Sequence, residues 1–313
     1  MRVGILGYGN LGKSLAEIIK NTDHKLVAIF SRRKLAEPNL PIYDRAAILD
    51  FADKLDTLII ATSSEGEAES DAAEYLKYFN TIDSFDNHEK IPAHRKNLEK
   101  IARERGRVAI TAVGWDPGLL SIGRALTKIG GIGENVNTFW GAGKSLGHSA
   151  ALRRISGVKD AVQFTVPKRE ARTLAKNTDA PLTAKDSHIR ECFIVPEPGA
   201  DTAKIEEKIK NLEGYFRGYE VAVHFISEAE FLRIKDKSSH RGEVISTKIS
   251  GGEKTSFDLK IEIPRNSDFT AKIMISYLNA INYLQNHRLF GAYTPLDIPL
   301  STLIDEKTYN NLI

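Results

Sequence analysis

A predicted strand that runs directly into a glycine turn and a helix constrains this chain more than any other feature. The apolar residues 3–6 lead into Gly7-Tyr8-Gly9-Asn10-Leu11-Gly12, after which apolar residues recur at helical spacing up to Ile19. In dinucleotide-binding units the first glycine permits the tight turn, the second lets the backbone approach a pyrophosphate, and the third lets the helix pack close to the strand. Residues 7–12 are therefore predicted to bind a dinucleotide at the helix N-terminus; a glycine turn without a ligand is the alternative.

The end of the next predicted strand indicates which dinucleotide binds. The apolar run 26–30 ends in Ser31-Arg32-Arg33, where an NAD-binding unit has an acidic residue that accepts hydrogen bonds from the ribose 2′-hydroxyl. A hydroxyl and two guanidinium groups suit a 2′-phosphate instead. We therefore predict that the cofactor is NADP and that Ser31, Arg32 and Arg33 bind it, although such an arginine pair is elsewhere usually solvated surface.

Strands that alternate with helices through residue 111 predict a doubly wound parallel sheet. The continuous apolar run 57–61 is typical of a strand that is buried on both faces. Thr62, Ser63 and Ser64 follow at its carboxyl end, which is the edge where ligands lie in open parallel sheets. These three residues are predicted to contact the cofactor; the alternative is that they cap the next helix.

Beyond Gly133 the pattern changes, and several predicted strands alternate between apolar and polar residues. These strands are 136–140, 161–166, 188–195, 220–226, 244–249 and 255–263. They predict a second α+β domain with a mainly antiparallel sheet, after a Rossmann-type domain. The expected division is 1–117 for the dinucleotide-binding domain, 118–265 for the second domain, and 266–313 for a C-terminal helix and tail that pack back on the first domain.

Length, charge and cysteine content exclude several classes of protein. A chain of 313 residues fits about two domains, and a net charge of +3 without blocks of Lys or Arg predicts neither a nucleic-acid nor a membrane partner.

Cys192 is the single cysteine and lies in an apolar run, so we expect a buried, inert thiol. No metal-ligand spacing such as His-Glu-x-x-His occurs, so no metal is predicted. Without an apolar run of membrane-spanning length or a leader before the first strand, the chain is expected to be cytoplasmic.

A series of motifs runs through both predicted domains. They are Gly-Tyr-Gly-Asn-Leu-Gly at 7–12, Phe-Ser-Arg-Arg at 30–33, Asp-Asn-His at 86–88, Gly-Trp-Asp-Pro-Gly at 114–118, Thr-Phe-Trp-Gly at 138–141, Gly-His-Ser at 147–149, Ala-Leu-Arg-Arg-Ile at 151–155, Arg-Asn at 265–266 and Asp-Phe-Thr-Ala at 268–271. In this order they resemble the meso-diaminopimelate dehydrogenases. These NADP-dependent enzymes oxidatively deaminate the D-centre of meso-2,6-diaminopimelate to L-2-amino-6-oxopimelate.

The resemblance spans nearly the whole chain and implies a homodimer whose second domain handles dimerisation and substrate. It assigns the D-centre of the substrate to Asp86, Trp115, Asp116, Trp140 and the turn Gly147-His148-Ser149. It assigns the distant L-centre to Thr165, Arg190, His240 and Asn266. Two departures from the family pattern are the segment 63–67, which differs from the usual turn, and Arg241, which intervenes before Gly242 in a loop where the family tends to have glycines.

The residue types agree with a substrate that carries two ammonium and two carboxylate groups. Asp86 and Asp116 can accept from an α-ammonium, and Asp116 is predicted to be the general base; helix capping is the alternative for both. Arg190 lies on an apolar strand and needs a partner, which is either a substrate carboxylate or a protein acid. Trp115 and Trp140, the two tryptophans of the chain, are predicted to exclude water and restrict the substrate's orientation, with core packing as the alternative for Trp140.

Two other functions fit the same motifs. One is another NADP-dependent D-amino-acid or diamine dehydrogenase, which would leave Arg190 without a substrate carboxylate. The other is a non-catalytic NADPH-binding regulatory protein, against which the two carboxylates and two tryptophans argue.

Overall fold

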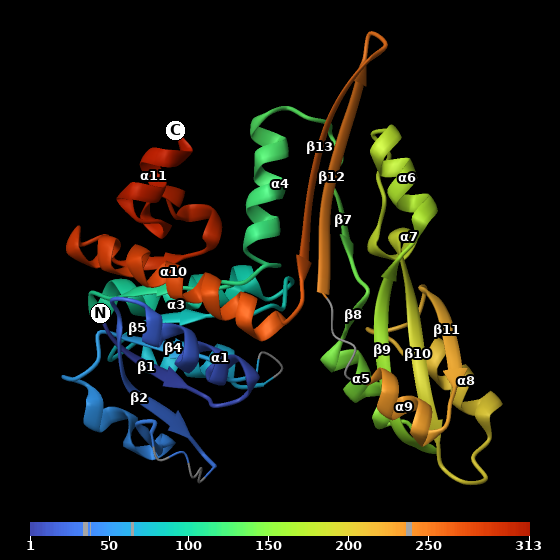
Figure 1. Ribbon diagram of the computed structural model, residues 1–313, viewed down its shortest axis with the longest axis horizontal. Coiled ribbons are helices and arrows are strands. Elements are labelled where there is room, and N and C mark those ends of the chain that lie inside the picture. The colour runs from blue at the N-terminus through green and yellow to red at the C-terminus, as the bar shows by residue number, and fades with distance from the viewer. Residues whose placement is uncertain (34–36, 38, 64–65, 236–239) are drawn as a thin grey trace. The chain divides into compact units, whose positions relative to one another are not determined.

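The computed structural model describes residues 1–33, 37, 39–63, 66–235 and 240–313, with the backbone alone at residue 146. These residues form two compact units. Unit 1 consists of Met1–Ile122 and Ser267–Ile313, and unit 2 consists of Gly123–Asn266. Each unit has its own sheets and cores and is described by itself, with the element labels of Figure 1.

Unit 1 is built on a seven-stranded sheet in which every neighbouring pair is parallel. Its strands are β1 (Arg2–Leu6), β2 (Lys25–Ser31), β3 (Ile42–Asp44), β4 (Thr57–Ile60), β5 (Asn80–Asp83), β6 (Val108–Ile110) and β14 (Gly291–Tyr293). The order β14-β6-β5-β4-β1-β2-β3 confirms the predicted doubly wound sheet. The sequence analysis did not predict β3 and β14, the two short strands at the edges of the sheet.

Helices and short 3₁₀ turns lie between these strands and after the last of them. The helices are α1 (Asn10–Ile18), α2 (Ala68–Tyr75), α3 (Ile91–Arg105), α10 (Asn266–Asn286) and α11 (Glu306–Leu312), together with α4 (Leu119–Ile129), which belongs to unit 2 from Gly123 onward. The 3₁₀ turns are η1 (Ile19–Asn21), η2 (Arg45–Phe51), η3 (Pro295–Asp297) and η4 (Leu300–Leu303). The helix predicted over 46–51 is thus a 3₁₀ helix, and α10 begins three residues earlier than the predicted start at residue 269.

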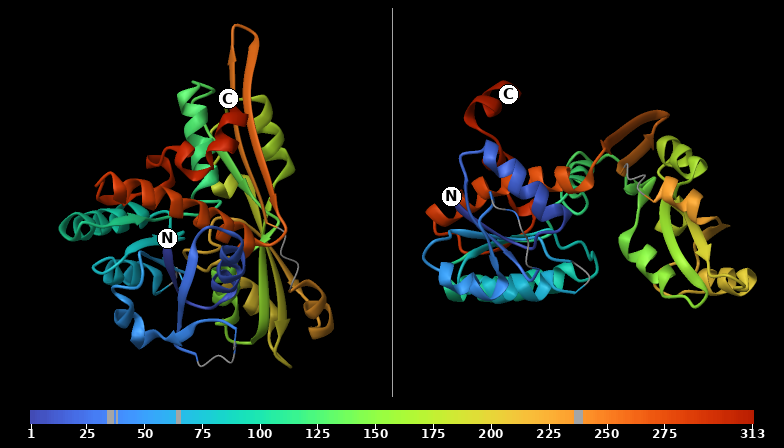
Figure 2. Two further views of the ribbon diagram at one scale, coloured as in Figure 1. Left: turned by 60° about the vertical axis from the view of Figure 1, so that its left-hand side comes forward. Right: turned by 60° about the horizontal axis from the view of Figure 1, so that its bottom comes forward.

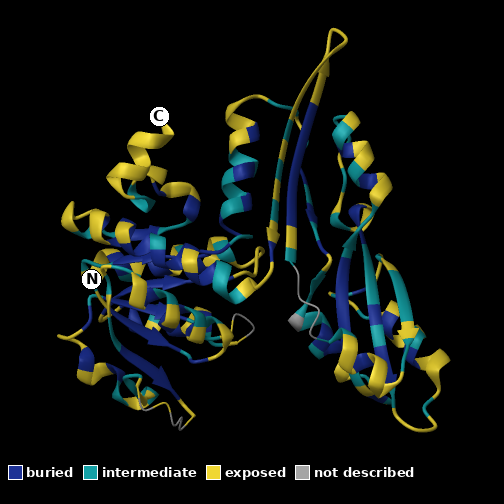
Figure 3. Ribbon diagram, viewed as in Figure 1, coloured by how far each residue is buried: buried dark blue, intermediate teal, exposed yellow. Residues whose placement is uncertain are grey.

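The sheet of unit 1 is buried on both faces, as its apolar strands predict (Figure 3). Along β4, Ile59 packs in one core with α1 and α10, whereas Leu58 and Ile60 pack in the other with α2 and α3. Figure 2 shows these helix pairs on opposite faces of the sheet. The alternation follows from the two-residue period of a strand, which sends neighbouring side chains to opposite faces.

Unit 2 has two sheets rather than one. Its strands are β7 (Asn137–Trp140), β8 (Gly143–Lys144), β9 (Val158–Pro167), β10 (His188–Pro196), β11 (Glu220–Phe225), β12 (His240–Ser250) and β13 (Glu253–Ile263). They form a four-stranded sheet in the order β11-β10-β9-β8 and a three-stranded sheet in the order β13-β12-β7. Every pair is antiparallel except β10 and β11, so the expected mainly antiparallel arrangement is confirmed.

Besides the larger part of α4, five further helices lie in unit 2 among the described residues. They are α5 (Leu146–Arg153), α6 (Arg169–Asn177), α7 (Ala184–Ser187), α8 (Thr202–Lys210) and α9 (Glu228–Ile234). Cys192 is fully buried in the core that α8 closes over the four-stranded sheet, and burial raises the pKa of its thiol to about 12. The predicted burial of this thiol is therefore confirmed. None of the described helices is long and apolar enough to cross a membrane.

Candidate functional site

The glycine turn between β1 and α1 has the geometry that a dinucleotide requires. Gly7 has a φ of 102°, and a Cβ on Gly12 would lie 2.1 Å from the Gly7 carbonyl oxygen, so neither position accepts a side chain without rearrangement. A Cβ on Gly9 would meet no atom within 4 Å. Gly9 is also the N-cap of α1 and forms no side-chain capping bond. The open space over the first helical N–H groups fits a pyrophosphate.

The residues predicted to bind the 2′-phosphate lie beside this turn. The Ser31 hydroxyl accepts from the backbone N–H of Arg33 (3.1 Å), and the Arg33 guanidinium donates to the carbonyl of Tyr8 (3.0 Å). Arg32 forms an ion pair with Glu67 at 2.6 Å. Arg32 also lines a surface depression of about 440 Å³, together with Arg45 of η2. The carboxylates of Asp44 and Glu74 line the same depression. Ser31 and the guanidinium groups of Arg32 and Arg33 are the donors that fit a phosphate ester.

Thr62 and Ser63 follow β4 at the same edge of the sheet. The Thr62 hydroxyl donates to Asp71 (2.8 Å), whose other oxygen accepts from Arg45 (2.5 Å). The N-cap of α2 is Glu67, so the alternative that Thr62 caps this helix is wrong. Ser63 accepts through its carbonyl from the N–H of Glu67 at 3.0 Å. The predicted contact of Ser64 with the cofactor lies outside the described residues.

Asp86, Trp115 and Asp116 follow β5 and β6, which are adjacent parallel strands, so all three leave the same edge of the sheet. A Cβ on Gly118 would lie 1.8 Å from the Gly114 carbonyl oxygen, and this close approach forms a tight turn that presents the partly exposed Trp115 and Asp116. Asp86 is exposed. Because the N-cap of α3 is Lys90, the capping alternative for Asp86 is wrong.

In unit 2, Thr165 and Arg190 are directly opposite each other on β9 and β10. The Arg190 guanidinium donates from Nη1 to the Thr165 hydroxyl and lies 4.2 Å from the ring centroid of Tyr219. Its buried Nε has no hydrogen-bond partner within the described ranges. The pair can therefore offer further donors to a carboxylate. Tyr219, which supports the guanidinium, was missed because nothing in its sequence neighbourhood marks it.

Trp140 is held by His188, a second residue that the sequence did not identify. The backbone N–H of Trp140 donates to His188 Nε2 (2.9 Å), and His188 Nδ1 donates to the Ala184 carbonyl (3.0 Å). The two rings are stacked at 5.2 Å. Burial lowers the pKa of His188 to about 4, so the ring is neutral at pH 7 and carries its proton on Nδ1. The signal was a histidine at the first residue of a predicted apolar strand.

The predicted turn at Gly147-His148-Ser149 is the first turn of helix α5, which is a correction of its local structure. The backbone N–H of His148 donates to the capping hydroxyl of Ser145. The ring of His148 contacts Tyr215 and Phe216 edge-on, with centroids 5.4 and 5.6 Å away. Burial, aided by the positive charge of Arg190, lowers the pKa of His148 to about 4. His148 is thus a neutral imidazole at pH 7.

Ser149 is buried and makes two bonds within unit 2. Its hydroxyl donates to the Ser145 carbonyl (2.5 Å) and accepts from the backbone N–H of Gln163 (3.0 Å). Gly147 lies before it in the same helical turn. The bond to Gln163 joins α5 to β9, and the bond to Ser145 lies within the first turn of α5. The role of this segment toward a substrate stays a prediction.

His240 and Asn266 have different surroundings. His240 begins β12, and its ring lies close to Gly143, where a Cβ would be 3.0 Å from the His240 Cδ2. Gly143 is the register partner of Thr165, so His240 lies beside the Thr165–Arg190 pair. Asn266 is exposed at the first residue of α10. Arg241 lies in strand β12 rather than in a loop, 3.7 Å from the carboxylate of Glu262, which corrects the expectation for that segment.

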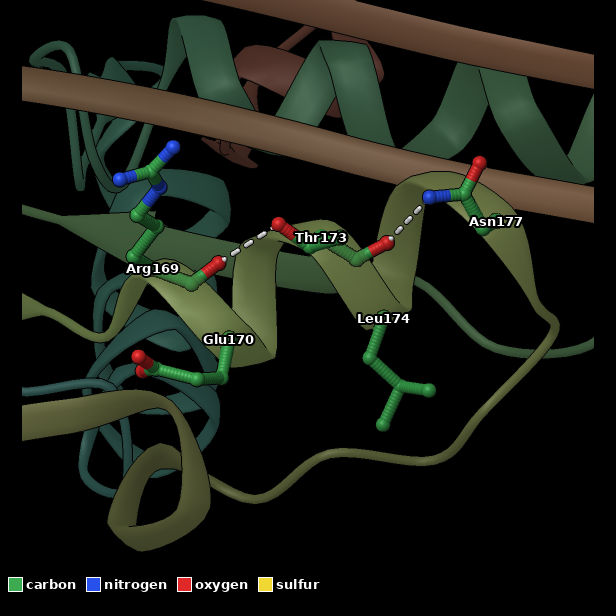
Figure 4. Close-up of a pocket in the computed structure, with 5 residues that line it drawn as sticks. All are labelled: Arg169, Glu170, Thr173, Leu174 and Asn177. Atoms are coloured by element: carbon green, nitrogen blue, oxygen red, sulfur yellow. Dashed lines mark hydrogen bonds between the residues drawn. The ribbon is translucent and has the colours of Figure 1, made fainter.

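A larger surface depression, of about 560 Å³, lies on one face of α6 (Figure 4). Two of its polar side chains bond within the helix: the Thr173 hydroxyl donates to the Arg169 carbonyl (3.0 Å), and the Asn177 amide donates to the Thr173 carbonyl (2.9 Å). None of the residues that line it belongs to a predicted binding motif. We therefore place the candidate site at the motifs and not in this depression.

Comparison with known proteins gives the same result in sequence and in structure. Residues 114–264 match the family described as the diaminopimelic acid dehydrogenase C-terminal domain. The meso-diaminopimelate D-dehydrogenase of Ureibacillus thermosphaericus is 40% identical over 310 residues, which cover 97% of this chain and 95% of that protein. The enzyme of the same name from Corynebacterium glutamicum is 39% identical over 300 residues, 95% of this chain and 93% of its own length.

Two solved structures extend this likeness to the fold. The C. glutamicum DAP dehydrogenase in complex with DAP superposes with a TM-score of 0.90 at 37% identity, over 100% of this chain and 98% of that one. An engineered D-amino acid dehydrogenase bound to NADP⁺ superposes with a TM-score of 0.87 at 37% identity and the same coverage. Both likenesses run through unit 1 and unit 2.

Proposed function

Since this chain belongs to the meso-diaminopimelate D-dehydrogenase family, we propose that it oxidatively deaminates the D-centre of meso-2,6-diaminopimelate with NADP. The products are L-2-amino-6-oxopimelate and ammonia, and the reaction is reversible. One observation supports the choice of a substrate with a second carboxylate. The half-buried Arg190 is directly opposite the buried Thr165, and its guanidinium Nε has no partner in the described part of the chain.

The cofactor site is assigned to residues of unit 1. The N–H groups of residues 7–12 bind the pyrophosphate, and Ser31, Arg32 and Arg33 bind the 2′-phosphate, with Thr62 and Ser63 at the next strand. When bound, NADP⁺ supplies the hydride acceptor. The open space at Gly9 and the Arg33 guanidinium beside Tyr8 support this assignment.

We assign proton transfer at the D-centre to Asp116, with Asp86 as a second acceptor for the α-ammonium. The ammonium must lose a proton before the α-carbon can lose its hydrogen as hydride. An ionised carboxylate only accepts hydrogen bonds and can take that proton. The resulting imine is hydrolysed by water to the ketone and ammonia. Trp115 and Trp140 exclude bulk water and orient the substrate. The Gly147-His148-Ser149 segment completes this set.

The L-centre is assigned to Thr165, Arg190, His240 and Asn266. Arg190 binds the distant carboxylate with two parallel N–H donors, and Thr165 adds a neutral hydrogen bond. A neutral side chain at position 190 would leave that carboxylate desolvated without a partner, which disfavours binding.

We further propose a cytoplasmic homodimer, as the family resemblance implies. Light scattering of the purified protein is expected to give twice the mass of one chain. Cell fractionation is expected to recover the NADP-linked activity with the cytoplasmic fraction. A monomeric mass with full activity would refute the dimer.

The decisive experiment is NADP⁺ reduction followed spectrophotometrically with meso-, LL- and DD-diaminopimelate and with simple D-amino acids. We expect turnover with the meso isomer and none with the LL isomer, which has no D-centre. Equal activity on D-lysine would contradict the role of Arg190. NADPH binding by calorimetry without turnover of any amino acid would favour the regulatory alternative.

A further inference from the structure

We propose that Asp83 and His94 form a buried buttress that positions the two loops carrying Asp86 and Trp115-Asp116. Neither residue belongs to a motif of the predicted site, and both are in unit 1. The inference rests on the proposed function, because it makes Asp83 and His94 positioning residues for that reaction.

Asp83 joins the ends of two neighbouring strands. The ladder between β5 and β6 runs through Thr81 and Ile82, one residue short of Asp83. There the Asp83 side chain continues the connection, because its Oδ1 accepts from the Thr111 hydroxyl (2.7 Å) and from the Ala112 N–H (3.2 Å). The same oxygen accepts from the N–H of Phe85 (3.0 Å), directly before Asp86. One carboxylate thus holds both loops where they leave the sheet.

The loop after β6 bends at Ala112, and Asp83 accepts hydrogen bonds from the N–H groups of Ala112 and of the next residue. Ala112 has a φ of 60°, in the left-handed region that residues other than glycine rarely adopt. Its N–H donates to the Asp83 side chain, and the N–H of Val113 donates to the Asp83 carbonyl (3.0 Å). These two bonds fix the direction in which residues 114–118 leave the sheet. A displacement of this turn would move Trp115 and Asp116 together.

His94 of α3 holds the second oxygen of the carboxylate. Its Nε2 lies 3.3 Å from Asp83 Oδ2, and the two side chains are 0% and 1% exposed. His94 Nδ1 has no partner among the described residues, so Nε2 is the nitrogen that donates to Asp83. The ring also packs against Phe85, with centroids 4.8 Å apart. Burial of a carboxylate is costly without such donors, and here both oxygens have them.

The other end of β5 supplies a matched control. Asn80 is also buried and also links β5 to β6, because its Oδ1 accepts from the Val108 N–H (2.9 Å). Its Nδ2 donates to the carbonyl of Asp56 (3.0 Å), directly before β4. Asn80 lies at the amino end of the strand, where no residue of the predicted site lies. Asn80 and Asp83 thus perform the same structural task, and Asp83 alone lies beside the catalytic loops.

The test compares Asp83→Ala with Asn80→Ala, using meso-diaminopimelate and NADP⁺ well below the melting temperature of either variant. We expect both to lower the melting temperature. Asp83→Ala should lower kcat by about 100-fold, as a displacement near 1 Å can do, with the NADPH Kd within about 3-fold of wild type. Asn80→Ala should keep kcat within about 3-fold. Equal kcat in the two variants would overturn the proposal.

If Asp83→Ala does not fold, two substitutions at Thr111 test the proposal instead. Thr111→Val removes the hydroxyl that donates to Asp83 at nearly constant volume, whereas Thr111→Ser retains it. We expect kcat to fall about 10-fold in the first and to stay near wild type in the second, because the Asp83 bond lies in the loop that carries Asp116. Equal kcat values in this pair would refute the buttress.

Failure of the proposed function gives a different result. A wild-type enzyme that oxidises another D-amino acid contradicts the substrate assignment, and the same kcat comparison with that substrate still tests the buttress. A wild-type protein that turns over none of the substrates contradicts both.

Discussion

The two units assemble their parts of the predicted site in different ways. In unit 1 the candidate residues lie in contiguous motifs at the carboxyl ends of parallel strands, and the close backbone approaches at Gly12 and Gly118 shape the motifs themselves. In unit 2 the important pairs come from separate segments. Arg190 is opposite Thr165 across two strands, and His188 holds Trp140 from 48 residues away.

This difference predicts how each unit responds to substitution. In a motif that is formed by local backbone sterics, a substitution should reduce turnover or cofactor binding. A cross-strand pair takes part in both packing and recognition, so a change there should alter substrate choice or stability. The following substitutions test that division, in order of decreasing effect.

Asp116→Asn in unit 1 should have the largest effect. The amide has no carboxylate to accept the ammonium proton, so we expect kcat to fall by about 1,000-fold, or roughly 4 kcal/mol of transition-state stabilisation. NADPH affinity and the melting temperature should stay near wild type. Steady-state kinetics and calorimetry check this result. A normal kcat with weaker substrate binding would show that Asp116 is not the general base.

His188 in unit 2 should make stability depend on pH. Burial lowers the pKa of His188 to about 4 in the folded chain, whereas an unfolded histidine has a pKa of about 6.5. As pH falls from about 6.5 to 4, the unfolded state binds the proton first, so the free energy of unfolding should fall by on the order of 3 kcal/mol. Above pH 6.5 this contribution is fully present.

His188→Phe provides the measurement, because phenylalanine keeps the ring and cannot titrate. The free-energy difference between wild type and variant, from urea unfolding at several pH values, should shrink as the pH falls. His148, whose pKa burial also lowers to about 4, titrates in both proteins and cancels from the difference. A difference that is constant from pH 7 to 4 would contradict the neutral, Nδ1-protonated state of His188.

Arg190→Met should change substrate choice more than stability. Removing a bidentate partner of the distant carboxylate should lower kcat/KM for meso-diaminopimelate by about 30-fold, or roughly 2 kcal/mol. Activity on D-lysine should change little, so the ratio of kcat/KM for meso-diaminopimelate to kcat/KM for D-lysine should fall. Arg217→Met, which removes an exposed guanidinium paired with Glu213 in the same unit, is the control and should leave both rates unchanged. An equal loss on both substrates would argue for a structural role.

Gly9→Ala should have the smallest effect and separates cofactor binding from folding. Because a Cβ there would meet no protein atom within 4 Å, stability should hold, while the methyl group occupies space assigned to the pyrophosphate. We expect NADPH to bind about 10-fold more weakly, or roughly 1.4 kcal/mol. Gly12→Ala is the contrast and should lose stability as well, because its Cβ would lie 2.1 Å from the Gly7 carbonyl oxygen. If Gly9→Ala bound NADPH as tightly as the wild type, the assignment of the pyrophosphate to this turn would be wrong.

The sequence by itself determined the features that depend on local physics. The glycine turn at residues 7–12 follows from backbone sterics within a few residues, and the parallel sheet follows from apolar strands that alternate with helices. The same local patterns identified Asp86 and Asp116 as residues at strand ends, and the family resemblance located the remaining candidates in the second domain.

Only the tertiary structure decided which distant residues meet. The register of β9 and β10 sets Arg190 opposite Thr165, and a shift of one residue would send Arg190 to the other face. The placement of β14 beside β6, and of His94 against Asp83, likewise depends on how whole elements pack. Packing sums many weak contacts between segments far apart in the chain, so no local pattern specifies these pairs, whereas a glycine turn is specified by its own backbone.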